Sequence, residues 1–151
     1  MNNRRPSDAT PLSPRYVCLA DRHHGHPTMR EPVSVQQFLR EFQVWWTRAN
    51  FRGAQPYVIL DDRLTRLHVK NPRRYAETDV RLRKFFFADQ VLILPRAQRS
   101  GLIAHEIGHA YWNGFPHTEA DADRAAKDML GVKITYDHRW PGKGLQSWEA
   151  R

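Results

Sequence analysis

Cysteine is almost absent from this sequence: Cys18 is the only one among 151 residues, so no disulfide can form within the chain. A lone thiol is typical of reducing compartments. Long apolar runs are also missing, because the longest, 85–88 and 91–94, are far shorter than the roughly 20 residues of a membrane span. The first residues include arginines with no apolar segment behind them, which predicts no secretory signal. We therefore expect a cytoplasmic protein with no membrane partner.

Negative charge is scarce relative to positive charge, because the sequence has 16 acidic residues and 24 basic ones. Its formal net charge is +8. Such a surface can attract nucleic acid or an acidic protein. The sequence has no recognisable nucleic-acid-binding motif, so an ordinary solvated basic surface is the simpler interpretation. The 40% hydrophobic content, with 5 Trp and 7 Phe, predicts a folded core of single-domain size.

The chain divides into three parts by composition. Residues 1–33 contain five of the ten prolines and are expected to form an extended or flexible lead-in, with a short strand at 16–19. Residues 34–136 are expected to form the domain, and 137–151 a polar C-terminal tail. Cys18, His23, His24 and His26 could form a second metal site, but their spacing matches no standard zinc pattern.

An amphipathic helix is predicted to begin after Ser34, which is a good N-cap with Gln37 in the position of a capping box. The apolar side chains that follow repeat at helical spacing and predict one buried stripe, which ends near Asn50. They are Val35, Phe38, Leu39, Phe42, Trp45, Trp46 and Ala49.

The middle of the chain is predicted to form strands at 57–60, 80–87 and 91–94, the last two paired as a hairpin. Helices are expected at 96–113, stopped by Gly114, and at 118–130, closed by Gly131. A last strand is expected at 132–136. The predicted fold class is α+β, with a small mixed sheet, an N-terminal helix and two neighbouring C-terminal helices.

The helix predicted at 96–113 contains the motif HExxH, as His105-Glu106-Ile107-Gly108-His109. Residues four apart lie about 40° apart around a helix, so the two imidazoles can share a metal ion. Glu106 is rotated by about 100° from His105 and would lie beside the metal, where it can take a proton from a water molecule. Two surface histidines on an ordinary amphipathic helix are the alternative interpretation.

Acidic residues begin the next helix, where Thr118 is a natural N-cap and Asp121 a suitable capping-box partner. A short loop between the helices would bring Glu119 close to the HExxH helix. Asp121 lies about 200° from Glu119 around the axis, whereas Asp123 is only about 40° away. We therefore expect Glu119 as third ligand and Asp123, with its shorter side chain, as a hydrogen-bond partner of a ligating histidine. Acidic residues that only complement the helix dipole are the alternative interpretation, which fits Asp121 better than Glu119.

HEIGH followed by E-x-x-A-D-R-A-A resembles the gluzincins, the zincin metallopeptidases whose third ligand is a glutamate. It is similar to the soluble ImmA/IrrE-like peptidases and, more distantly, to the HtpX-like membrane peptidases, over roughly residues 85–130. The spacing from His109 to Glu119 is shorter than in those families. The resemblance implies that His105, His109 and Glu119 bind Zn²⁺, that Glu106 is the base, and that Asp123 orients a ligand.

The function expected from this resemblance is zinc-dependent hydrolysis of a polypeptide, lying along an edge strand near 91–94. His117, Tyr136 and His138 are candidate oxyanion donors. The main alternative is a non-catalytic, zinc-stabilised module with basic faces that contact nucleic acid or a protein partner. The two differ in whether the fourth zinc position is open to water or closed by Cys18, His117 or His138.

Overall fold

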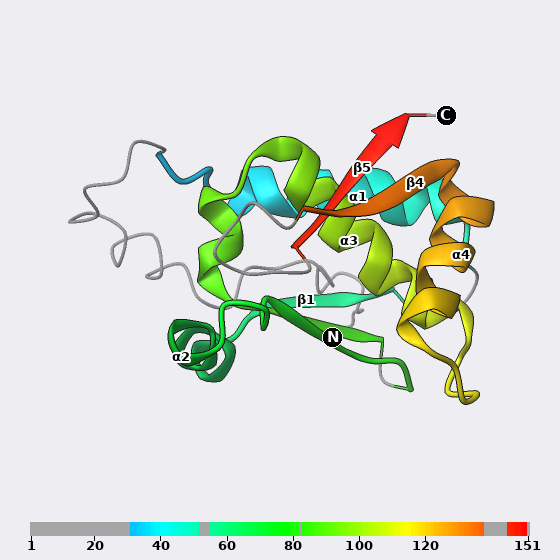
Figure 1. The fold of residues 1–151 in the computed structure, drawn as a ribbon, viewed down its shortest axis with the longest axis horizontal. Helices are drawn as coiled ribbons and strands as arrows, with labels where there is room; N and C mark the ends of the chain where they lie inside the picture. Colours follow the sequence, from blue (N-terminus) through cyan, green and yellow to red (C-terminus); the bar gives the residue numbers. More distant parts are fainter. Residues whose placement is uncertain (1–30, 52–54, 82, 138–144, 151) are drawn as a thin grey trace, which may run out of the picture.

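The computed structural model of the chain describes residues 31–51, 55–81, 83–137 and 145–150, and the fold is a small mixed α+β domain (Figure 1). One sheet has three strands in the order β1-β3-β2, and a second sheet pairs β4 with β5. The elements are α1 (Val35–Ala49), β1 (Tyr57–Leu60), α2 (Asp62–Lys70), β2 (Ala76–Asp79), β3 (Lys84–Phe87), the 3₁₀ helix η3 (Asp89–Ile93), α3 (Arg96–Tyr111), α4 (Glu119–Leu130), β4 (Val132–Asp137) and β5 (Leu145–Ala150).

The first helix forms where the sequence predicts it. The Ser34 hydroxyl accepts a hydrogen bond from the backbone N–H of Gln37 at 3.0 Å, and Asn50 ends α1 in the left-handed conformation with φ 60°. The Gln37 side chain donates to Glu41. The expected apolar stripe is buried apart from Ala49, which is half-buried, so helix periodicity alone identified this face of the core.

Strand β3 is the centre of the three-stranded sheet, because it pairs in parallel with β1 and antiparallel with β2. Phe85 and Phe87 are fully buried on one face of it. They meet the aromatic stripe of α1, with ring centroids 5.1 Å apart for Phe85 and Phe42 and 5.0 Å apart for Phe87 and Phe38. This aromatic contact fixes α1 against the sheet.

The strand predicted at 91–94 is wrong, and so is its hairpin with 80–87. Residues 89–93 form the 3₁₀ helix η3, in which Val91 and Leu92 are fully buried. Both hydrogen-bonding edges of β3 are already taken by β1 and β2, so this segment cannot pair with β3 in a hairpin. An edge strand for substrate binding near 91–94 is therefore excluded. Strand β3 also begins later than expected, at Lys84.

Three elements were not anticipated. Helix α2 follows β1 directly, and Asp61 caps it by accepting from the backbone N–H of Arg63 at 2.8 Å. Strand β2 reads Ala-Glu-Thr-Asp and has no apolar pattern. Strand β5 lies within the segment expected to be a polar tail, pairs antiparallel with β4 and lies against α3.

Helices α3 and α4 pack closely together near the C-terminal end of α3 (Figure 1). Thr118 and Asp121 form the predicted capping box of α4, and Gly131 closes that helix with φ 69°. Within the described residues no helix combines the length and apolar character needed to cross a membrane. The strand expected at 16–19 lies outside the described residues.

Candidate metal centre

Helix α3 presents His105, Glu106 and His109 together, and their ligand atoms all lie within 4.8 Å of one another. His105 and Glu106 are buried, with 2% and 5% of their surfaces exposed. The two imidazole rings stand nearly perpendicular, with centroids 4.7 Å apart. This cluster could hold a metal ion, as the spacing of HExxH on a helix predicts.

Glu119, the first residue of α4, reaches the same point from the neighbouring helix. Its Oε1 lies 2.9 Å from Nε2 of His105 and 3.4 Å from Nε2 of His109. The two Nε2 atoms are 3.1 Å apart. One carboxylate oxygen and two imidazole nitrogens therefore form a compact triangle between α3 and α4.

The second nitrogen of His105 contacts Asp123, one turn after Glu119 on α4. Nδ1 of His105 lies 2.7 Å from Oδ1 of Asp123, and the Tyr136 hydroxyl donates to Oδ2 of the same carboxylate at 2.7 Å. A carboxylate accepts only, so Nδ1 carries the proton. In neutral His105 this leaves the lone pair on Nε2, the atom that faces Glu119.

A second chain of hydrogen bonds ends at His109. Nδ1 of His117 lies 2.7 Å from the backbone carbonyl oxygen of Phe115, so this nitrogen donates. In neutral His117, Nε2 is then an acceptor, and it receives the Nδ1 proton of His109 at 2.7 Å. Trp112 stacks on the His117 ring at an interplanar angle of 9°. We infer that in the neutral imidazoles Nε2 of His109, like that of His105, carries its lone pair toward Glu119.

Two of the three expected oxyanion donors therefore have other partners. His117 hydrogen-bonds to His109, and the Tyr136 hydroxyl donates to Asp123. Both residues hold the side chains of the triangle in place. The α3–α4 loop brings His117 to His109, and β4 brings Tyr136 to Asp123. His138, Cys18, His23, His24 and His26 lie outside the described residues.

The triangle has a strong preference for positive charge. Burial lowers the pKa of His105, but its hydrogen bonds to Asp123 and Glu119 outweigh burial and raise this pKa to about 10. The hydrogen bond to His105 lowers the pKa of Glu119 to about 2. Burial lowers the pKa of His109. A single positive charge, from a proton or a cation, is thus favoured between the converging atoms.

Glu106 lies beside the triangle and is held by the sheet. Its Oε1 accepts a hydrogen bond of 2.6 Å from the Thr78 hydroxyl of β2. Both residues face a cavity of about 400 Å³, lined by Ala76, Glu77, Thr78, Val80, Glu106, His109, His117 and Glu119. Burial raises the pKa of Glu77, but its hydrogen bonds and ion pairs with Arg63 and Arg74 outweigh burial and lower it. Glu106 and Glu119 are therefore the cavity's carboxylates without a basic arginine or lysine partner among the described residues.

Gly108 allows the two helices to approach closely enough to bring these groups together. A Cβ atom at this position would lie 2.1 Å from the backbone carbonyl oxygen of Ala122 on α4. Only glycine fits such an approach. Ala122 lies between Glu119 and Asp123 in the sequence, so this contact sets the position of both carboxylates relative to His105.

Thr78 and Gly108 are the site residues that sequence reasoning missed. Gly108 did carry a signal, because glycine inside a helix is unfavourable unless packing requires it. Thr78 carried none, since it lies in a polar strand that only pairing with β3 defines. No protein-family model matches this chain, and no curated protein or solved structure is significantly similar to it.

Proposed function

We propose that this protein is a zinc-dependent metallopeptidase of the gluzincin type, in which His105, His109 and Glu119 hold the metal and Glu106 is the general base. The observation that carries the proposal is the triangle of ligand atoms, with edges of 2.9, 3.1 and 3.4 Å. Ligands at about 2.0–2.1 Å in a tetrahedral zinc site lie about 3.3 Å apart. The observed edges are close to that spacing.

The chemistry of the three atoms supports a cation at their centre. In the neutral tautomers inferred above, both Nε2 atoms direct lone pairs at each other and at a carboxylate oxygen. Such acceptors repel one another unless a positive charge lies between them. Two imidazoles and one carboxylate are a donor set typical of catalytic zinc.

Glu119 is a better third ligand than Glu106. Oε1 of Glu119 lies within 3.4 Å of both Nε2 atoms, whereas Oε1 of Glu106 is engaged by the Thr78 hydroxyl. Oε2 of Glu106 remains as the proton acceptor. The two glutamates thus have separate tasks, one on the metal and one beside it.

The cavity in front of the triangle supports catalysis over the non-catalytic alternative. Structural zinc sites are closed by four protein ligands, whereas catalytic sites leave one position for water or substrate. Within the described residues, His117 is turned to Nδ1 of His109 and supplies no ligand toward the cavity. The space of about 400 Å³ beside Glu106 is large enough for part of a substrate.

Zinc, when bound, supplies Lewis-acid chemistry that polarises a carbonyl group and lowers the pKa of a water molecule. Oε2 of Glu106 accepts a proton from the attacking water as the water oxygen bonds to the carbonyl carbon. When the carbon–nitrogen bond breaks, Glu106 returns this proton to the leaving amine. The Thr78 hydroxyl holds the carboxyl group in position throughout.

A polypeptide substrate would lie along β2. Strand β2 pairs with β3 on one side, and no other described strand pairs with its second edge. Ala76, Glu77 and Thr78 of this strand line the cavity beside Glu106. An extended chain can add to such an edge through backbone hydrogen bonds. This assignment replaces the edge strand expected at 91–94.

Metal analysis and a peptidase assay on matched variants test the proposal. We expect the purified protein to contain one equivalent of zinc and to cleave unfolded polypeptides. Glu106→Gln should retain zinc and lose hydrolysis, because the amide cannot accept the proton. Glu31→Gln, the same change at an exposed position, is the control and should remain active.

Three outcomes have distinct meanings. Undiminished hydrolysis by Glu106→Gln would contradict the assigned base. Stoichiometric zinc without hydrolysis in the unmodified protein would favour the non-catalytic module. Absence of zinc, together with unchanged melting temperatures of His105→Ala and His109→Ala in added zinc, would show that HExxH here is fortuitous.

A further inference from the structure

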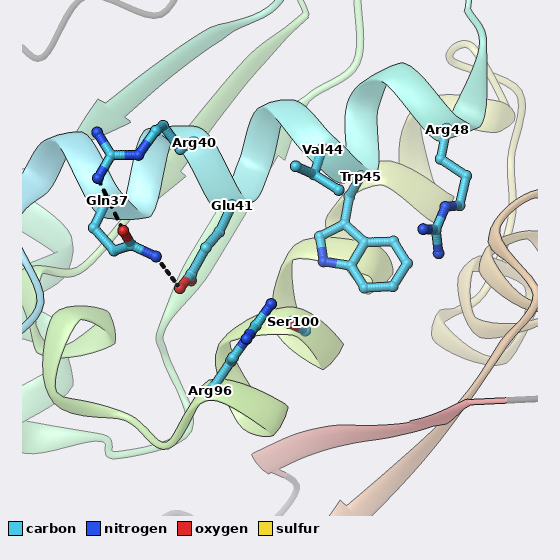
Figure 2. A pocket seen from close by; sticks show the side chains of 8 residues that line it. All are labelled: Gln37, Arg40, Glu41, Val44, Trp45, Arg48, Arg96 and Ser100. Carbon is cyan, nitrogen blue, oxygen red and sulfur yellow. Dashed lines mark hydrogen bonds between the residues drawn. The ribbon is translucent and has the colours of Figure 1, made fainter.

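A second cavity, of about 270 Å³, lies between α1 and the first turns of α3, away from the candidate metal centre (Figure 2). Its lining residues are Gln37, Arg40, Glu41, Val44, Trp45, Arg48, Arg96 and Ser100. Arg96 precedes His105 by nine residues, which is about 180° around the helix axis. The cavity is therefore on the opposite side of α3 from the HExxH motif.

The carboxylate of Glu41 and the side-chain oxygen of Gln37 in this cavity already accept hydrogen bonds. The Glu41 carboxylate accepts hydrogen bonds from Nε and one terminal nitrogen of Arg99, each at 2.7 Å, and from Nε2 of Gln37 at 3.0 Å. The side-chain oxygen of Gln37 accepts from Arg40 at 2.9 Å. The buried Arg99 also offsets the charge of Glu41. The cavity therefore carries a surplus of positive charge, which comes from Arg40, Arg48 and Arg96.

Two of these arginines are directed at the space itself. Figure 2 shows Arg96 extending from α3 toward α1, between Glu41 and Trp45, and Arg48 lying beside Trp45. The Arg48 guanidinium lies 4.8 Å from the centre of the Trp45 ring, which restricts it by a cation–π contact. Among the described residues, neither Arg48 nor Arg96 forms a hydrogen bond or an ion pair with an acidic side chain. Their donors are available to a ligand.

We propose that this cavity binds a phosphate group, through the guanidinium groups of Arg48 and Arg96 with Arg40 at its edge. Guanidinium groups bind phosphate oxygens by charge-assisted hydrogen bonds. The donors come from two different helices, so they approach the ligand from different directions. The oxygens of a tetrahedral phosphate point in several directions and can accept hydrogen bonds from each of these guanidinium groups. The two oxygens of a planar carboxylate can accept from fewer of them. The phosphate belongs to a free phosphorylated compound or to a nucleic-acid backbone.

Calorimetric titration with inorganic pyrophosphate tests this site in the full chain. We expect saturable binding by the unmodified protein. Arg48→Gln and Arg96→Gln should each raise the dissociation constant at least about tenfold, because each removes a charge-assisted hydrogen bond. Both positions are exposed, so the variants should fold, which thermal melting checks. Arg66→Gln removes the same charge from the exposed face of α2 and should bind like the unmodified protein.

A titration with one further ligand identifies the source of the phosphate. A single-stranded oligonucleotide whose binding shows the same loss in Arg96→Gln would identify a nucleic-acid backbone. Pyrophosphate binding without oligonucleotide binding would identify a free phosphorylated compound. The proposal is wrong if pyrophosphate does not bind, if succinate binds equally well, or if the arginine substitutions leave binding unchanged, as binding at the metal centre would. None of these measurements depends on peptidase activity.

Discussion

Substitution of Gly108 by alanine sets helix propensity against helix packing. Gly108 lies inside α3, where alanine is favoured over glycine by about 1 kcal/mol. The added Cβ would lie 2.1 Å from the carbonyl oxygen and 2.9 Å from the carbonyl carbon of Ala122. Both atoms belong to the backbone of α4, so no side-chain rotation relieves the overlap.

The cost follows from the size of this overlap. A normal contact of at least about 3 Å requires α4 to move away by roughly 1 Å, and overpacking of this kind costs about 1–3 kcal/mol. After the gain in helix propensity, we expect a net destabilisation of up to about 2 kcal/mol. The site should suffer more, because the same movement draws Glu119 away from His105, from which it is now 2.9 Å distant. A misplacement of about 1 Å can cost about 100-fold in activity.

Thermal melting and zinc titration of Gly108→Ala measure these two effects, and Gly114→Ala is the control. Gly114 has φ 88°, so alanine is strained there, but its nearest neighbour is an Arg81 side-chain carbon 3.8 Å away. Gly114→Ala should therefore lose stability and retain zinc affinity, whereas Gly108→Ala should lose both. A Gly108→Ala protein that is more stable than the unmodified one, with unchanged zinc affinity, would refute the close helix contact.

Five further substitutions test the site and the core. Glu119→Ala should abolish tight zinc binding in a titration. Asp121→Ala should leave zinc affinity unchanged and only lower the melting temperature slightly, because it removes the Asp121 side chain from the capping box of α4. His117→Phe should weaken zinc binding about 10–100-fold, and equal affinity would show that its hydrogen bond is dispensable. Arg99→Ala should destabilise the protein by about 3–5 kcal/mol in denaturant unfolding, because the buried Glu41 loses its ion-pair partner and keeps only the hydrogen bond from Gln37. Burial raises the pKa of Glu41, but Arg99 and Gln37 outweigh burial and lower it, so its stabilisation is complete above about pH 5 and is lost at lower pH. Glu41→Gln should reduce the loss of stability below about pH 5. An unchanged dependence of the unfolding free energy on pH would contradict this role of Glu41.

Elements with local sequence signals could be predicted without the fold. Ser34 and the apolar stripe behind it specify α1, and Thr118 with Asp121 specifies the start of α4. The spacing of His105 and His109 put both imidazoles on one side of α3. These features depend on helix periodicity and on hydrogen bonds between residues at most four positions apart, so they need no knowledge of the rest of the fold.

Features that depend on contacts between separate segments became apparent only in the folded chain. The apolar segment at 91–94 has the composition of a strand, but β1 and β2 occupy both edges of β3, and the segment turns into a 3₁₀ helix. The polar strand β2 exists because it pairs with β3, and this pairing carries Thr78 to Glu106. His117 reaches His109 from the α3–α4 loop, and Tyr136 reaches Asp123 from β4. The pairing of β2, and the hydrogen bonds of His117 and Tyr136 to His109 and Asp123, depend on how separate elements pack against one another, so no local pattern encodes them.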